Sequence, residues 1–190
     1  WGVGNEVEGG WQIGKKTAEE YARTFAEYGK AMKRVDPGIK LMACGGASDW
    51  KTPWVDYGKL LLEQTAKRID TIGIHVYVGN PEDDFARFMT AVDDFGDRLT
   101  GYEGLLAAMR AEQKIDRPIH MAVDEWNVMY RTNGHDDGHE EVYNLEDALV
   151  VAQFLNLFIR HARAVRMANL AQVVNVIAPI VTRPDGLLKQ

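Results

Sequence analysis

Cysteine is almost absent from the 190-residue sequence: Cys44 stands alone, so no disulfide can form within the chain. A thiol without a partner requires no oxidising compartment, and we expect Cys44 simply to fill core space. Positive charge is also scarce, because 22 Lys and Arg residues face 28 Asp and Glu residues and leave a net charge of −6. Nucleic-acid binders usually carry a basic face, so we expect no nucleic-acid partner.

Long apolar runs are missing as well. None reaches the roughly 18 residues that a membrane-spanning helix needs, so no membrane partner is expected. Hydrophobic residues nevertheless make up 46% of the chain and charged residues 26%, which is enough to build a buried core. The sequence does not begin with methionine, so a signal peptide could only lie upstream of it. We expect a globular protein of the cytoplasm.

Short apolar strands and longer amphipathic helices alternate along the sequence, without low-complexity linkers or internal repeats. Thr17 to Glu20 has the form of a capping box, and the helix that it opens ends at the breaker Asp36-Pro37-Gly38. Further helices are expected over 55–67, 85–95, 102–112 after a break at Gly101, and 145–161. Strands are expected over 1–6, 39–44, 71–77 and 118–126, whereas 166–182 fits a strand or a helix equally well.

This order of elements predicts an α/β protein with a parallel sheet, either a (β/α)8 TIM barrel or a doubly wound fold. Three strands end in polar pairs, Asn5-Glu6, His75-Tyr77 and Asp124-Glu125, and strand ends are where a (β/α)8 barrel keeps its active site. A doubly wound sheet more often carries a Gly-Xaa-Gly-Xaa-Xaa-Gly loop, which is absent. The sequence therefore favours the barrel.

The predicted barrel is incomplete. A whole (β/α)8 barrel usually needs about 250 residues, and only about four to five strand–helix units fit here. We therefore expect residues 1–190 to be one partial barrel domain, about strands four to eight, with the N-terminal strands upstream and no second domain. Such a piece would leave strand edges unpaired and is not expected to be active alone.

Glu6 and Glu125 are the candidate catalytic pair, because two carboxylates facing one cleft are the minimum apparatus for cleaving a glycosidic bond. One must be protonated to donate to the leaving oxygen and the other ionised to attack the anomeric carbon, so their environments should separate their pKa values. Asn5 and Glu6 can both reach a substrate only if the strand bends or ends there, as its glycines would allow. His75 and Tyr77, two residues apart on one strand, should both point inward.

Four motifs carry a resemblance that spans essentially the whole chain: W-G-V-G-N-E, H-V-Y, D-E-W-N and A-N-L-A-Q-V-V-N-V-I-A-P-I. The sequence resembles the α-L-arabinofuranosidases of glycoside hydrolase family 51, retaining enzymes of a large barrel clan. Asn-Glu alone is shared by that whole clan, whereas GNEVEGGWQIG and NVIAPI are more specific to the family. The resemblance implies hydrolysis of terminal α-L-arabinofuranosyl groups from arabinan, arabinoxylan or their oligosaccharides.

The resemblance also implies residue roles and partners. Glu6 becomes the acid/base on strand four and Glu125 the nucleophile on strand seven. Asn5 is implied to bond the sugar 2-hydroxyl and Tyr77 to orient the nucleophile. Trp11 is implied to form a wall beside the leaving-group sugar, and Gln190 to make a last sugar contact. The expected substrate-binding residues are Asn5, Trp11, His75, Tyr77 and Gln190. A homo-oligomer such as a hexamer is implied, and no cofactor or metal is needed.

Other polar and aromatic residues have simpler interpretations. We expect Glu8 to lie in a loop and Asp124 to point away from Glu125. The tryptophans at positions 50, 54 and 126 are expected to pack rather than to bind ligand. The loop 135–139, HDDGH, contains metal-ligand residue types without a known spacing, so a solvated loop is the better interpretation.

Two rival functions stay open at this point. Another retaining barrel glycosidase, of the xylanase or cellulase type, would use the same carboxylates, and arabinofuranoside and pyranoside substrates would separate the two. A non-catalytic carbohydrate-binding protein would be favoured if the glutamates lay far apart. A separation of about 5 Å between the carboxyl groups would support retention, and about 9 Å inversion.

Overall fold

A five-stranded parallel sheet forms the centre of the chain, described by a computed structural model for residues 1–46, 53–131 and 140–190. Its strands lie in sequence order, and each pairs in parallel with the next. They are β1 (Gly2–Val3), β2 (Met42–Cys44), β3 (Thr71–Val78), β4 (His120–Val128) and β5 (Val165–Leu170). An antiparallel hairpin of β6 (Ile180–Arg183) and β7 (Gly186–Lys189) follows. The predicted α/β class and parallel sheet are confirmed.

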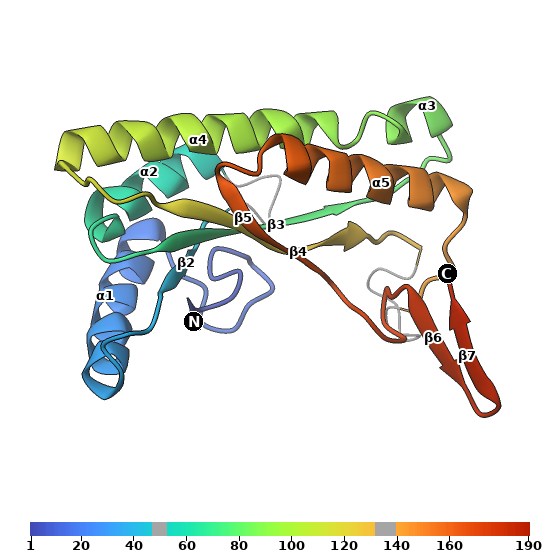
Figure 1. The fold of residues 1–190 in the computed structure, drawn as a ribbon, viewed down its shortest axis with the longest axis horizontal. Coiled ribbons are helices and arrows are strands. Elements are labelled where there is room, and N and C mark those ends of the chain that lie inside the picture. Colours follow the sequence, from blue (N-terminus) through green and yellow to red (C-terminus); the bar gives the residue numbers. More distant parts are fainter. Residues whose placement is uncertain (47–52, 132–139) are drawn as a thin grey trace.

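Helices connect the strands. They are α1 (Ala18–Val35), α2 (Trp54–Thr65), α3 (Phe85–Phe88), α4 (Asp93–Gln113) and α5 (Leu145–Arg160). The predicted capping box is present, since the Thr17 hydroxyl accepts from the Glu20 amide and the Glu20 carboxylate accepts from the Thr17 amide. In Figure 1, α4 and α5 run along the upper side of the sheet, and the β6–β7 hairpin projects beyond the end of β4. No helix among the described residues is long and apolar enough to cross a membrane.

The predicted helix break at Gly101 is wrong. α4 runs through this residue without interruption. A Cβ atom on Gly101 would lie 2.5 Å from the Trp54 ring, so the glycine allows α2 to approach α4 closely. Gly101, which looks like a helix breaker in the sequence, is therefore a packing residue in the structure. Trp54 packs as predicted, with its ring centroid 4.7 Å from that of Tyr102.

The core lies between the sheet and the helices. The Trp126 ring projects from β4 onto α5, where it contacts Phe154 and Phe158 at centroid distances of 5.4 and 5.0 Å. Trp126 is thus a packing residue, as predicted. Cys44 packs against the core, with its thiol 3.5 Å from a carboxylate oxygen of Glu8. Glu8 lies in the turn after β1, in line with the loop expected for it, and its side chain is buried.

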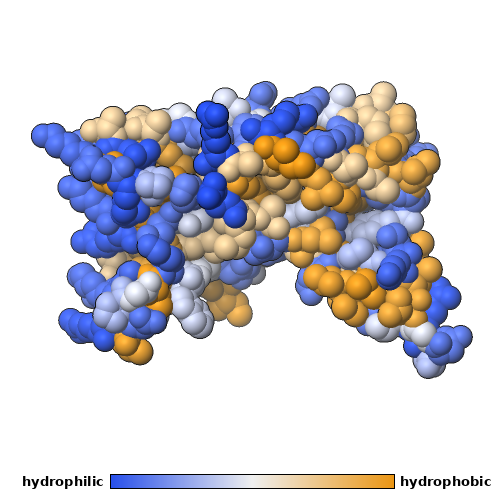
Figure 2. All heavy atoms as spheres, viewed as in Figure 1, coloured by the Kyte–Doolittle hydropathy of each residue, from blue (hydrophilic) through white to orange (hydrophobic). Residues whose placement is uncertain are grey.

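Several large apolar side chains remain uncovered on α5 and on the hairpin. Figure 2 shows apolar surface gathered over these two elements. The exposed residues include Leu145, Leu155, Ile159, Leu187 and Leu188. β1 and β5 are the two edges of the sheet, each with one strand neighbour among the described residues.

Candidate active site

The candidate site begins where β1 ends. The strand stops at Val3, and the backbone then turns through Gly4 at φ +96° and Glu6 at φ +44°. The turn confirms the expectation that the strand ends at this point. A left-handed conformation is uncommon for a residue with a side chain and occurs often at functional sites. It directs the Glu6 carboxylate towards β3, where its Oε1 lies 3.0 Å from His75 Nδ1.

β3 and β4 supply the opposite side of the site. The parallel register pairs His75 with Glu125 and Tyr77 with Asn127. His75 and Tyr77 lie two residues apart on one strand and both reach Glu125: the Tyr77 hydroxyl donates to Oε1 at 2.6 Å, and His75 Nδ1 lies 3.5 Å from Oε2. Burial and the bond to Glu125 raise the pKa of Tyr77, so its hydroxyl keeps its proton and remains a donor.

The two predicted glutamates converge at this point. Glu6 comes from the turn after β1, the first strand of the sheet, and Glu125 from β4, the fourth, yet a carboxylate oxygen of each lies within 4.8 Å of the other and of a His75 ring nitrogen. His75, with a side chain only 7% exposed, separates the two negative charges. The arrangement brings together two carboxylates, a cation and a hydroxyl donor.

The protonation of His75 and that of the surrounding carboxylates depend on each other. Burial alone would lower the pKa of His75, but hydrogen bonds to Asp124 and Glu6, together with the charges of Asp124 and Glu125, raise it to about 10. In the same cluster the bond from His75 lowers the pKa of Glu6. Burial acts in the opposite direction, and the bond from Trp11 again lowers it. At neutral pH the site therefore contains a protonated imidazole and an ionised Glu6.

This charge state bears on the predicted acid. From the sequence we expected different environments for Glu6 and Glu125, with Glu6 as the proton donor. Hydrogen bonds in the substrate-free site instead lower the pKa of Glu6, which favours its ionised form. The cause is the donor arrangement: His75 bonds one carboxylate oxygen, while the Trp11 indole and the Gln12 amide bond the other at 2.6 and 3.4 Å.

The same cluster has the composition of a metal site, and its suitability can be judged from its protonation. A histidine binds a metal through the lone pair of a neutral ring nitrogen. The surrounding carboxylates raise the pKa of His75 to about 10, so a metal ion would have to displace a proton from the ring in order to bind Glu6, His75 and Glu125 together. The HDDGH loop, 135–139, lies outside the described residues, as does Trp50.

Two predicted sugar-contacting residues lie apart from the cluster. Asn5 lines a cavity of about 420 Å³ between the turn and α1, which Tyr21 and Tyr28 also line. The Gln190 carboxamide bonds three backbone groups: the Tyr143 amide at 2.9 Å, the Ala178 carbonyl at 2.8 Å and the Glu141 carbonyl at 3.2 Å. Within residues 1–46, 53–131 and 140–190, no hydrogen bond joins either residue to the two glutamates. Their roles stay predictions.

Asp124 joins the cluster, which sequence reasoning did not foresee. Its Oδ2 lies 3.4 Å from His75 Nε2, on the side of the ring opposite the glutamates. A Cβ atom on Gly73 of the adjacent strand would lie 2.7 Å from Asp124 Oδ1, so the glycine makes room for this carboxylate. The signal in the sequence was the glycine two residues before His75.

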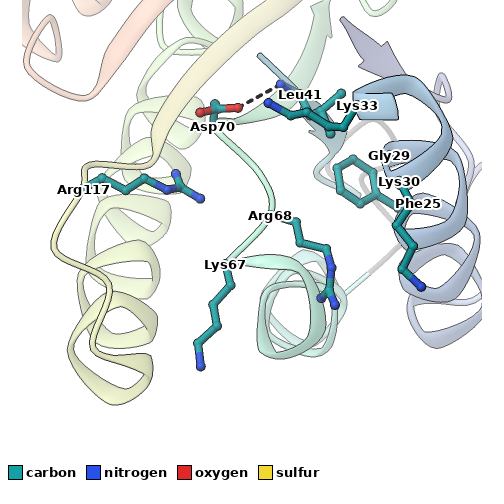
Figure 3. A pocket seen from close by; sticks show the side chains of 9 residues that line it. All are labelled: Phe25, Gly29, Lys30, Lys33, Leu41, Lys67, Arg68, Asp70 and Arg117. Atoms are coloured by element: carbon teal, nitrogen blue, oxygen red, sulfur yellow. Dashed lines mark hydrogen bonds between the residues drawn. The ribbon is translucent and has the colours of Figure 1, made fainter. Parts of the chain in front are cut away.

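A second cavity lies at the other end of the strands. It has a volume of about 360 Å³ and is lined mainly by basic side chains from α1 and from the segments before β3 and β4 (Figure 3). Asp70 is the acidic residue that lines it, and this carboxylate accepts from the Leu41 amide at 3.0 Å. The cavity lacks a carboxylate pair and is not the candidate active site.

Comparisons with known proteins agree on one family. Residues 124–190 match a family model described as the α-L-arabinofuranosidase C-terminal domain. A curated relative, an intracellular exo-α-(1→5)-L-arabinofuranosidase of Halalkalibacterium halodurans, is 39% identical over 98% of this chain and 39% of its own length. The chain therefore spans about two fifths of the length of that relative.

Solved structures give the same result. A family 51 α-L-arabinofuranosidase from Bifidobacterium longum superposes with a TM-score of 0.89 at 27% identity, covering 100% of this chain and 41% of that one. An α-L-arabinofuranosidase from Thermotoga maritima, solved as an arabinose complex, superposes with a TM-score of 0.84 at 37% identity, covering 100% and 37%. The similarity extends over the sheet and the site as one unit.

Proposed function

We propose that the chain, which belongs to the α-L-arabinofuranosidases of glycoside hydrolase family 51, supplies the catalytic centre of a retaining exo-glycosidase. The substrate would be an arabinose-containing polysaccharide or oligosaccharide from which terminal α-L-arabinofuranosyl groups are released. The observation that carries the proposal is the convergence of Glu6 and Glu125 across a non-adjacent pair of strands, with carboxylate oxygens within 4.8 Å. Retaining glycosidases have carboxyl groups about 5–5.5 Å apart, close enough for direct attack on the sugar.

In the proposed reaction Glu125 is the nucleophile. Its oxygen attacks the anomeric carbon while Glu6 donates a proton to the leaving oxygen, which gives a glycosyl-enzyme ester and a free alcohol. Glu6 then removes a proton from water, and the water oxygen displaces Glu125 from the anomeric carbon. The Tyr77 hydroxyl, which donates to Glu125 at 2.6 Å, would fix the attacking carboxylate.

Glu6 must gain a proton before the first step. Its pKa lies below the usual value in the substrate-free structure because of the bonds from His75 and Trp11. A substrate that enters beside Trp11 would bury Glu6 further or take away one of its donors, and both changes raise the pKa of a carboxyl group. The second step, in which Glu6 acts as a base, suits the charge state that is already present.

The parallel sheet is proposed to be the C-terminal part of a (β/α)8 barrel, with β1 to β5 as strands four to eight. Sequential parallel strands, open edges at β1 and β5, and uncovered apolar residues on α5 all support this assignment. Residues 1–190 would then be one partial catalytic domain, completed by strands that precede β1. A cytoplasmic location is proposed because the Halalkalibacterium relative is named intracellular. The oligomeric state stays a prediction.

The test uses a polypeptide that contains the whole proposed barrel. Glu125→Ala should reduce hydrolysis of 4-nitrophenyl α-L-arabinofuranoside to background, and Glu6→Ala should slow hydrolysis of oligosaccharides about 10²- to 10⁴-fold. Azide should restore turnover of the aryl substrate by Glu6→Ala, giving an arabinosyl azide. Glu63→Ala, at an exposed position of α2, is the matched control.

Four results would count against the proposal. Full activity of Glu125→Ala would remove the nucleophile assignment. A first-formed product of inverted configuration, observed by proton NMR, would exclude the covalent step. Faster hydrolysis of a β-D-xylopyranoside would favour a xylanase-type enzyme, and no hydrolysis of either substrate a carbohydrate-binding protein.

A further inference from the structure

Tyr21 joins β1, the strand that leads into the turn with Glu6, to its neighbour β2. This residue of α1 is only 2% exposed, and its hydroxyl donates to the carbonyl of Val3 and accepts from the amide of Cys44 at 2.8 Å. Val3 and Cys44 are the last residues of β1 and β2. The last β1–β2 register pair is Val3 with Ala43, so the hydroxyl bridges the strands where their ladder ends.

The backbone immediately after this bridge is in an unusual conformation. Gly4 at φ +96° and Glu6 at φ +44° both lie in the left-handed region, which a residue with a side chain occupies at a cost. Such a conformation persists only where the surroundings determine it. The Tyr21 ring provides part of those surroundings, since a Cβ atom on Gly4 would lie 3.4 Å from a carbon of the ring.

We propose that Tyr21 is a positioning residue for Glu6. Among the described residues, no hydrogen bond joins Tyr21 to Glu6 or Glu125. Its hydroxyl fixes the carbonyl three residues before Glu6, and through the turn it sets the distance of the Glu6 carboxylate from Glu125. The inference rests on the proposed function, because it concerns the residue proposed to protonate the leaving group. It adds a part of α1 to the catalytic apparatus, which otherwise comes from β3, β4 and the turn after β1.

The leaving group provides a readout that a general loss of stability would not reproduce. A sugar leaving group needs the proton from Glu6, whereas 2,4-dinitrophenolate departs without one. A displacement of about 1 Å at a reacting group can cost about 10²-fold in rate. Tyr21→Phe should therefore lower kcat up to about 10²-fold for arabino-oligosaccharides, with a small change in KM, and should leave glycosylation by 2,4-dinitrophenyl α-L-arabinofuranoside within about threefold of wild type.

The experiment compares Tyr21→Phe with Tyr28→Phe in the polypeptide that contains the whole proposed barrel. Tyr28 is a matched control, because it lies on the same helix and is 60% exposed. A double variant with Glu6→Ala adds a second criterion: a residue that acts only through Glu6 has no further effect when Glu6 is absent. Should Tyr21→Phe fail to fold, replacement of Tyr21 by 3,5-difluorotyrosine keeps the ring and weakens the hydroxyl as an acceptor, and the same substrates are compared.

The outcomes separate this inference from the proposed function. Equal activity of Tyr21→Phe and Tyr28→Phe, or equal losses with both leaving groups, would overturn the positioning role while the wild type still hydrolysed arabinofuranosides. A further loss in the Glu6→Ala background would overturn it too. A wild type that hydrolyses neither arabinofuranoside would overturn the proposed function and, with it, the assignment of Tyr21 to catalysis.

Discussion

His75 should stay protonated far above the pH at which a histidine normally loses its charge. Its ring lies between three carboxylates: Nδ1 is 3.0 Å from Glu6 and 3.5 Å from Glu125, and Nε2 is 3.4 Å from Asp124. Tyr77 is a further titratable residue beside these carboxylates, and its hydroxyl donates to Glu125. Burial opposes the charge on His75, but the carboxylates outweigh it and raise the pKa from 6.5 to about 10.

This rise in pKa can be converted into a free energy. A displacement from 6.5 to about 10 corresponds to about 5 kcal/mol of preference for the protonated state in the fold, an upper value because the three acids are coupled. A raised pKa stabilises the folded protein fully below about pH 6.5, the unfolded value, and the contribution disappears as the pH rises through about 10. The free energy of unfolding of His75→Gln should therefore fall furthest below that of wild type in acid and neutral solution, and least above pH 10.

NMR of 13C-labelled histidine in the full-length protein measures the titration directly, with the His75 signal assigned from its absence in His75→Gln. His120 is an internal control in the same spectra: burial and the nearby Arg166 and Arg110 lower its pKa, so its signal should titrate below 6.5. Glu6→Gln should bring the His75 pKa down, because one hydrogen-bonded anion is removed. A midpoint for His75 near or below 6.5 would refute the reasoning and leave the imidazole neutral at physiological pH.

Two further predictions concern catalysis and stability. Tyr77→Phe removes the 2.6 Å bond to Glu125; a bond to a charged group is worth about 1.5–3 kcal/mol, so kcat should fall about 10- to 150-fold, and an unchanged kcat would contradict the orienting role. Phe154→Ala empties a fully buried site against Trp126 and should lower the free energy of unfolding by about 3–5 kcal/mol in denaturant titrations. Leu155→Ala, at a position 50% exposed, is its control and should cost much less; equal losses would argue against the core assignment.

Local signals in the sequence predicted most of the helices. The capping box at Thr17 predicted the start of α1. The helix expected over 145–161 corresponds to α5, where the Asn144 side chain accepts from the Asp147 amide. These features depend on residues three or four positions apart, so one sequence contains the information. β1 was recognised by its apolar residues, although only Gly2 and Val3 pair with β2.

Features that depend on contacts between elements were harder to predict. Gly101 looked like a helix breaker because the Trp54 ring that needs the space lies on another helix. Asp124 was expected to point away from Glu125, and its contact with His75 was not predicted, because it depends on the space beside Gly73 of the neighbouring strand. The segment 166–182 was ambiguous because β5 and the hairpin strands are specified by their partners.

The candidate site divides in the same way. Glu6, His75, Tyr77 and Glu125 were predicted together, because parallel strands place their C-terminal ends on one edge and all four residues lie there. Tyr21 was not predicted as a site residue, since helical periodicity places a residue on a face and says nothing of its hydroxyl. The contact that matters joins it to Val3, 18 positions earlier, and to a neighbouring strand.

The electrostatics of the site imply that its protons must be redistributed when a substrate binds. The positively charged His75 lies beside both glutamates, which the proposed reaction needs in opposite protonation states. While Glu6 holds bonds from His75 and Trp11, it stays ionised, and each oxygen of its carboxylate accepts from a donor. Entry of a sugar beside Trp11 would change the donors at Glu6, whereas the Tyr77 hydroxyl donates to Glu125 from β3. The difference in protonation between the two glutamates would then arise when the substrate binds, while Tyr77 holds Glu125, the proposed nucleophile, in place.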